Sequence, residues 1–304
     1  MKEIITLQLG NVSNHVGAHF WNLQQVAARQ QEGDEDSERE NGDFDAARLF
    51  RFHREGSLQP RVLITDLRLN VGRLLQDQEE GENADCEDAD VEWGSGTSKL
   101  ARSDVPDRNP FQLFLQDCGA ESYYGGGALV RGSNPSGAQV MLPVRPPENC
   151  IEHWSDYASF TLNRDENLCL LPRWTTSDNF DTFLSSYLPE VVPREFGEVF
   201  MDKLRILAEE CDSLSTIQIF SDIHDGFGSL TGKLLQEIRE DYGRGINVPV
   251  WALSPGARQG NTGELAESLH RLSVPQAYAN LSEHASVVIP ISTSAATSSR
   301  LTHV

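Results

Sequence analysis

The amino-terminal segment constrains the fold more than any other part of the chain. Residues Glu3 to Leu9 alternate apolar and polar side chains, a pattern that predicts a β-strand. Gly10 interrupts this pattern, and Asn14 is expected to cap a helix whose apolar side chains recur at helical spacing. A strand, a glycine turn and a helix N-terminus together aim free backbone N–H groups at an anion, most often a phosphate. An ordinary strand–helix unit without a ligand has the same pattern, so both interpretations stay open.

Strand and helix patterns alternate along the rest of the chain. Short apolar runs predict further strands at 61–65, 168–171, 216–220 and 248–253. Amphipathic patterns predict helices over 195–211 and about 229–242, the second ending at Gly243. Pro249 indicates that the last strand begins there or lies at an edge. This alternation predicts an α/β fold with a parallel sheet covered by helices on both faces.

Three segments between these elements are predicted to be irregular. Residues 31–49 and 76–92 are acidic and nearly free of large apolar side chains, which is typical of mobile surface insertions. Acidic interaction segments are the alternative interpretation. Residues 119–149 are rich in Gly and Pro. The glycines within this stretch lack a strand–turn–helix frame, so it is interpreted as an irregular linker and not as a phosphate loop.

The composition excludes several function classes. A formal net charge of −21 argues against direct binding of nucleic acid or anionic lipid. No apolar run is long enough to span a bilayer, and the amino terminus lacks a signal-peptide core, so no direct membrane insertion is expected. The 5 cysteines form no C-x-x-C pair and are interpreted as reduced cytosolic thiols. The 8 histidines show no metal-ligand spacing, so no metal site is expected.

The amino-terminal residues also resemble the beginning of a tubulin. The residues that match without a gap are Met1, Glu3, Ile4, Gln8, Gly10, Asn14, Gly17, Ala18, Phe20 and Trp21. Tubulins follow the first glycine with Gln and Cys, which line the nucleotide pocket, whereas this chain has Asn11 and Val12. These departures, with the run that ends at Asn22, resemble the Misato family of divergent tubulin-like proteins.

The turn after the strand at 216–220 resembles the phosphate-binding loop of tubulins only in part. Its Gly226, Gly228 and Ser229 align with Gly, Gly and Ser of the tubulin signature. His224 and Asp225, however, stand where the signature has further glycines. A carboxylate beside a polyphosphate is repulsive, and bulk at glycine positions hinders close approach of the backbone. The turn is therefore interpreted as a Misato-type signature and as a weak phosphate site.

Asp66 directly follows the strand predicted at 61–65. Tubulins also have an acid at this position, and it serves the region that binds magnesium and phosphate. Tubulins continue this strand end with a second acid, but the chain has Arg68, which opposes Mg²⁺. A helix N-cap is the alternative role for Asp66. No catalytic and no metal-ligating residue is expected. The candidate residues of a vestigial nucleotide site are Gly10, Asn11, Asp66, Gly226, Gly228 and Ser229.

The resemblance implies a tubulin-type, Rossmann-like nucleotide-binding domain over 1–304 that is incomplete, in a chain that is either truncated or an unusual short form. It further implies a non-catalytic protein of mitochondrial distribution, morphology and inheritance, including the partitioning of mitochondria and their DNA. Such a protein would act through protein partners, at the mitochondrial surface or among cytoskeletal and chaperone proteins, at the outer face of mitochondria and in the cytoplasm. No cofactor is expected; the alternative is a divergent GTP-binding protein with weak or no hydrolysis.

Overall fold

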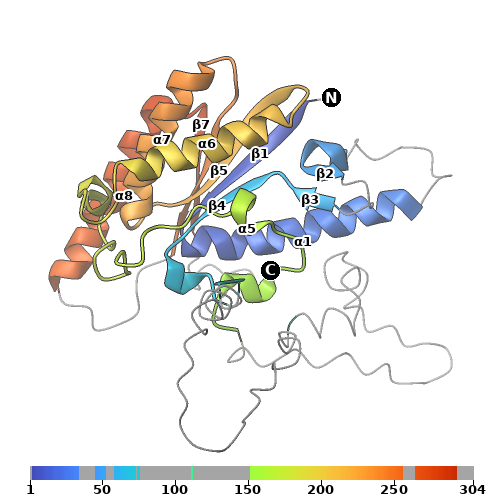
Figure 1. The fold of residues 1–304 in the computed structure, drawn as a ribbon. Coiled ribbons are helices and arrows are strands. Elements are labelled where there is room, and N and C mark those ends of the chain that lie inside the picture. The colour runs from blue at the N-terminus through green and yellow to red at the C-terminus, as the bar shows by residue number, and fades with distance from the viewer. Residues whose placement is uncertain are drawn as a thin grey trace, which may run out of the picture.

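Five parallel strands form the central sheet, in the order β4–β1–β5–β6–β7 (Figure 1). The strands are β1 Glu3–Leu9, β4 Val62–Thr65, β5 Leu214–Asp222, β6 Pro249–Ser254 and β7 Val287–Ser292. This computed structural model describes residues 2–33, 45–52, 58–72, 74–75, 111, 151–255 and 264–292. The predicted α/β fold with a parallel sheet is confirmed.

Helices cover both faces of the sheet. The long helices are α1 Asn11–Gly33, α6 Glu195–Glu209, α7 Gly226–Tyr242 and α8 Glu264–His284. The short elements are η1 Ala46–Arg48, β2 Phe50–Phe52, β3 Leu58–Pro60, η2 Arg68–Asn70, η4 Trp154–Tyr157, α5 Arg164–Asn167 and η5 Phe183–Tyr187. Figure 1 shows α1 and the β2–β3 hairpin on one face, with α6, α7 and α8 on the other.

Alternate residues of each strand supply the two cores. In β4, Leu63 joins the core beneath α6 and α7, whereas Val62 and Ile64 join the core beneath α1. Trp21 of α1 and Trp154 of η4 are fully buried in the second core. Burying one large apolar side chain stabilises a fold by about 1.5–3 kcal/mol. Both faces of the sheet are therefore held by packing, as expected for a parallel sheet.

Several boundaries differ from those that the sequence predicts. Helix α1 begins at Asn11, so the prediction that Asn14 caps it is wrong; the Asn14 side chain instead bonds Thr65 O and Asp66 Oδ2. The run at 168–171 is not a strand. It lies along the outer edge of β4, with one bridge between Leu168 and Ile64 and backbone hydrogen bonds from Cys169 N to Ile64 O and from Leu171 N to Asp66 O. Pro249 is the first residue of β6. A strand that begins at this proline was one of the two alternatives predicted from the sequence.

The hairpin of β2 and β3 follows an acidic segment. The prediction that residues 31–49 form one mobile insertion is wrong at its carboxyl end, because Leu49 is buried against the core beneath α1. The other end of that range is the last turn of α1, at Gly33. Residues 34–44, 76–92 and 119–149 lie outside the described residues. Leu49 shows that an apolar residue at the end of an acidic run can anchor the strand that follows.

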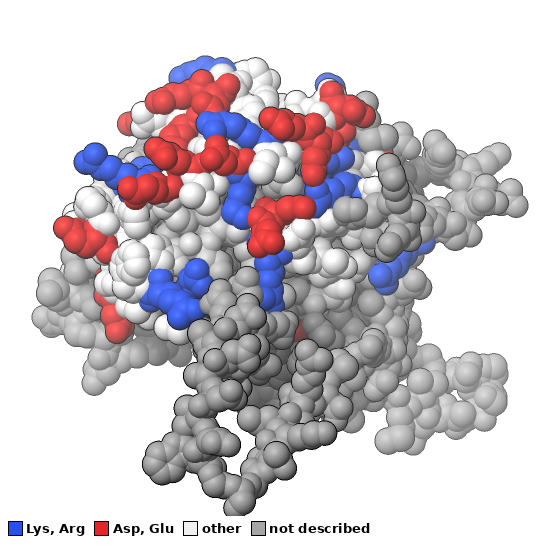
Figure 2. Space-filling model, in the orientation of Figure 1, with Lys and Arg blue, Asp and Glu red and all other residues white. Residues whose placement is uncertain are grey.

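Charged side chains gather on the surface over α6 and α7 (Figure 2). Arg205 of α6 pairs with Asp202 at 2.6 Å and with Asp241 of α7 at 2.8 Å. A cavity of about 350 Å³ beside these pairs is lined mainly by acidic residues of the same two helices. Exposed pairs of this kind contribute little to stability. Within the described part of the chain, no helix combines the length and apolar character needed to cross a bilayer.

Candidate ligand site at the ends of β1 and β5

The candidate site lies at the carboxyl ends of neighbouring parallel strands, where ligands bind in open α/β sheets. Strand β1 pairs with β5 in a register that places Leu9 opposite Ser221. Gly10, the residue after β1, therefore lies beside Asp222, the last residue of β5. A Cβ atom on Gly10 would lie 2.5 Å from the Asp222 carboxyl carbon, and Gly10 has a φ of +107°. Only glycine fits this position, because both the backbone angle and the space exclude a side chain.

The carboxylate of Asp222 occupies the N-terminus of α1. It accepts hydrogen bonds from the backbone N–H of Val12 at 2.9 Å and of Ser13 at 2.8 Å. The Ser13 hydroxyl donates a third bond to it at 2.6 Å. Free N–H groups and the positive end of the helix dipole favour an anion at this point. The anion that the fold provides is a side chain of the protein itself.

Burial makes this carboxylate costly. Burial, followed by the negative charge of Asp225, raises the pKa of the Asp222 carboxyl to about 7. The neighbouring His224 and the bonds from Ser13 and Val12 act in the opposite direction. Such a shift places Asp222 among the perturbed acids that are concentrated at functional sites.

The N-terminus of α7 is also closed by the protein. Asp225 is its N-cap, and the Asp225 carboxylate accepts a bond from Phe227 N at 2.9 Å. The backbone N–H of Gly226 donates to Phe180 O at 3.0 Å, and that of Gly228 donates to Asp225 O at 3.3 Å. The donors that would cradle a phosphate in this turn are therefore already bonded within the chain.

The candidate residues of the turn have packing roles. A Cβ atom on Gly226 would lie 2.7 Å from the ring of Phe180, and one on Gly228 would lie 2.9 Å from Ala277 Cβ of α8. Ser229 is buried, and its hydroxyl hydrogen-bonds the Ser186 hydroxyl of η5 at 2.6 Å. Glycine at these positions lets the ring of Phe180 and helix α8 approach the start of α7. The same residue types would serve a phosphate loop, so the sequence alone does not distinguish the two roles.

Asp66 and Asn11 are the remaining candidate residues. The hydrogen bonds of Asp66 go to residues outside the turn between β5 and α7. Asp66 is fully buried and accepts bonds from Asn14 Nδ2, Leu67 N and Asn70 Nδ2, so it joins α1 to the start of η2. Burial raises the pKa of its carboxyl to about 6, although those bonds oppose the shift. Asn11, the first residue of α1, is exposed. The alternative role of Asp66 as a helix N-cap is wrong, because the N-cap of η2 is Leu67 and the oxygens of Asp66 bond Asn14, Leu67 and Asn70.

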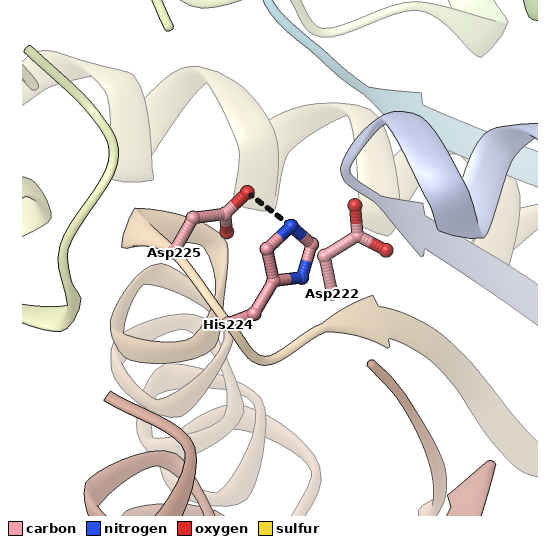
Figure 3. Close-up of side chains that lie close together, drawn as sticks. All are labelled: Asp222, His224 and Asp225. Atoms are coloured by element: carbon pink, nitrogen blue, oxygen red, sulfur yellow. Dashed lines mark ion pairs between the residues drawn. The ribbon is translucent and has the colours of Figure 1, made fainter. Parts of the chain in front are cut away.

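His224 completes the site. Its side chain is buried between the two carboxylates, with Nε2 3.5 Å from Asp225 Oδ2 (Figure 3). The sequence analysis missed Asp222 and Ser13 as site residues. The signal that could have found them is the end of β5: an acid there lies beside the first turn of α1 whenever β1 and β5 are neighbours. The strand-end site is thus acidic, and carboxylates of the chain itself close the N-termini of α1 and α7.

Comparisons with known proteins agree with the fold. The Misato Segment II tubulin-like domain matches residues 2–117, and the tubulin domain matches residues 175–303. The fold and these matches define a tubulin-like protein. Similar proteins include Protein misato homolog 1 of Bos taurus, 30% identical over 96% of this chain and 52% of its own length. Protein misato of Drosophila melanogaster is 27% identical over 96% of this chain and 52% of its own length.

A fungal relative shows the same coverage. Protein DML1 of Phaeosphaeria nodorum is 28% identical over 97% of this chain and 52% of its own length. The chain therefore spans about half the length of the curated relatives that it matches. The chain belongs to the Misato family of tubulin-like proteins.

Proposed function

We propose that this chain is a non-catalytic tubulin-like protein that acts in mitochondrial distribution, morphology and inheritance through protein partners. The observation that carries the non-catalytic part is the position of Asp222, whose carboxylate takes the backbone donors of α1 that a phosphate would need. Asp225 does the same at the N-terminus of α7. Two helix N-termini that face the strand ends are thus supplied with anions before any ligand arrives.

The energetic cost of adding a phosphate here is large. A unit charge at about 4 Å and an effective dielectric of about 20 is worth about 4 kcal/mol. Repulsion of that size lowers an affinity by a factor of several hundred, because about 1.4 kcal/mol is tenfold. The phosphate would also have to displace Asp222 from its bonds to Val12 and Ser13. GTP hydrolysis would further need a metal, and Asp66 has its oxygens committed elsewhere.

The mitochondrial part of the proposal is supported by membership of the Misato family alone. The same membership supports protein partners, of the mitochondrial surface, the cytoskeleton or the chaperones, and a location at the outer face of mitochondria and in the cytoplasm. The net charge of −21 supports partners other than nucleic acid or anionic lipid.

Calorimetric titration of GTP and GDP into the purified chain, with and without Mg²⁺, tests the non-catalytic part. The expected result is no saturable binding below millimolar nucleotide and no release of phosphate. Micromolar affinity for GTP would overturn the proposal in favour of a divergent GTP-binding protein. That second function rests on Gly10, Gly226, Gly228 and Ser229, which still stand at helix N-termini.

Depletion of the protein in its own cells tests the mitochondrial part. Imaging of the mitochondrial network and counting of mitochondrial DNA through several divisions are the measurements. We expect clumped or unevenly inherited mitochondria, restored by re-expression of the chain. An unchanged network and an unchanged DNA count after complete depletion would contradict this part of the proposal and leave the nucleotide result untouched.

A further inference from the structure

Asp222, His224 and Asp225 bring three potential metal ligands together in the strand–helix turn. One ligand atom from each residue lies within 4.8 Å of the other two (Figure 3). In the close-up, the imidazole of His224 stands between the two carboxylates, and all three side chains come from the end of β5 and the start of α7. The spacing of the histidines alone does not predict this site, because its other two ligands are acids.

The charges of the three side chains call for a cation. Asp222 and Asp225 repel each other, which is one reason why the pKa of Asp222 is raised. Within the described part of the chain, no Lys or Arg pairs with Asp222; its side-chain oxygens bond only Val12 and Ser13. A buried carboxylate is costly unless it is paired or coordinates a metal. A divalent ion between the two acids would remove that cost.

The protein already holds these ligands in place. Asp222 Oδ1 accepts both bonds from Ser13, and Oδ2 accepts one bond from Val12, which leaves Oδ2 a second lone pair. Asp225 Oδ1 accepts from Phe227 N, while Oδ2 is the oxygen that faces His224. The backbone bonds that anchor both acids are independent of any ion. The donors are therefore ordered before binding, which lowers the entropy cost of coordination.

The spacing suits a tetrahedral ion. Ligand atoms about 2.1 Å from such an ion are about 3.4 Å apart. His224 Nε2 and Asp225 Oδ2 are 3.5 Å apart, so these two need no movement. Asp222 has to approach by about 1.4 Å at most, because all three atoms already lie within 4.8 Å of one another and the tetrahedral spacing is about 3.4 Å. An imidazole with two carboxylates favours a first-row transition metal over Mg²⁺ or Ca²⁺, which prefer oxygen ligands throughout.

We propose that Asp222, His224 and Asp225 bind one divalent transition-metal ion of the Zn²⁺ type. The ion joins the end of β5 to the start of α7 and, through Asp222, to the N-terminus of α1. Three protein ligands leave one coordination position for water or for a donor atom of a partner. The site goes beyond the proposed function, since it gives the closed strand-end site a ligand of opposite charge to a phosphate.

Titration of Zn²⁺ into the chain, followed by calorimetry and by metal analysis after dialysis, tests the proposal. The wild type should retain about one equivalent more than His224→Gln, whose affinity should fall at least tenfold. Asp225→Ser should lose the same site, although Ser keeps the helix cap. His284→Gln is the matched control, because His284 lies 3.9 Å from a single carboxylate, that of Glu283. Zn²⁺ should also raise the melting temperature of the wild type and of this control, but not of the other two variants.

Equal stoichiometry and affinity in the wild type, His224→Gln and Asp225→Ser would overturn the proposal and indicate adventitious binding at thiols or other histidines. Circular dichroism and urea unfolding without metal establish that each variant is folded. If a variant does not fold, pulsed electron paramagnetic resonance of Cu²⁺ in the wild type decides the question. Coupling to one imidazole nitrogen at one equivalent supports the site, and coupling to none or to several contradicts it.

Discussion

His15 makes the stability of this fold sensitive to mild acid. The side chain lies in the first turns of α1, edge-on to the ring of Tyr157 of η4 with 5.8 Å between the ring centres. Burial, together with the nearby His19 and His153, lowers the pKa of His15 to about 4, whereas Asp156 opposes the shift. Its Nδ1 atom is buried without a hydrogen-bond partner among the described residues. A proton on this imidazole therefore has little to stabilise it.

The change of the free energy of unfolding with pH follows from the difference between the pKa values of His15 in the folded and unfolded states. The pKa of His15 is about 4 in the folded state and 6.5 in the unfolded state, so the unfolded chain binds more protons between those values. The contribution of neutral His15 to stability is complete above about pH 6.5 and is lost as the pH falls toward about 4. Between about pH 7.5 and pH 5.5 the loss is about 1.4 kcal/mol. The lower limit stays above the isoelectric point of 4.7, near which precipitation would interfere.

Urea unfolding at both pH values, followed by tryptophan fluorescence, measures this loss. His15→Gln removes the titrating group and keeps a polar side chain of similar reach. The wild type should lose about 1.4 kcal/mol more than the variant on going to the lower pH. Parallel losses, equal within about 0.5 kcal/mol, would refute the burial of an uncharged His15 beneath η4.

Three further outcomes are expected. Gly10→Ala should cost at least about 2 kcal/mol in urea unfolding, because Gly10 has a φ of +107° and a Cβ would meet the Asp222 carboxyl; unchanged stability would contradict that contact. Asp66 has the opposite pH sign to His15: its pKa is raised to about 6, so its contribution is present in acid and is lost as the pH rises. Relative to Asp66→Asn, the wild type should lose about 1.3 kcal/mol between about pH 5 and pH 7, and a gain would refute the shift. Gly232→Ala should lower the melting temperature by several degrees, because the new Cβ would lie 1.7 Å from Asn280 Oδ1; an unchanged melting curve would show that α7 and α8 are less closely packed.

Local patterns in the sequence predicted the strands and helices whose signals lie within one short window. The strand at β1 and the glycine that ends α7 are examples, since Gly243 has a φ of +67°. Local patterns did not predict α8 or β7, and each of these elements contains a proline. Pro275 lies inside α8, and Pro290 lies in β7, which is an edge strand where a missing N–H is tolerated. Position in the sheet, which no local pattern contains, explains why β7 is possible.

The site was predicted less completely than the fold, because it depends on pairing across the chain. Asp225 was recognised as an obstacle to phosphate, but its role as the α7 cap was not. Asp222 was not predicted as a site residue, although its carboxylate takes the N–H groups at the start of α1. Its partners Val12 and Ser13 are more than 200 residues away in sequence. Only the register of β1 against β5 brings them together.

The register of β1 against β5 also decides which group occupies the N-terminus of α1. A slip of one residue between β1 and β5 would turn Asp222 to the opposite face of the sheet and leave the N–H groups of α1 open. The native register instead seats the carboxylate against Gly10, which has no side chain to prevent it. Gly10, which aligns with a tubulin glycine, is thus the residue that lets the Asp222 carboxylate reach the N-terminus of α1. Once Asp222 is seated, the same turn holds two carboxylates and an imidazole, and its chemistry favours a cation over a phosphate.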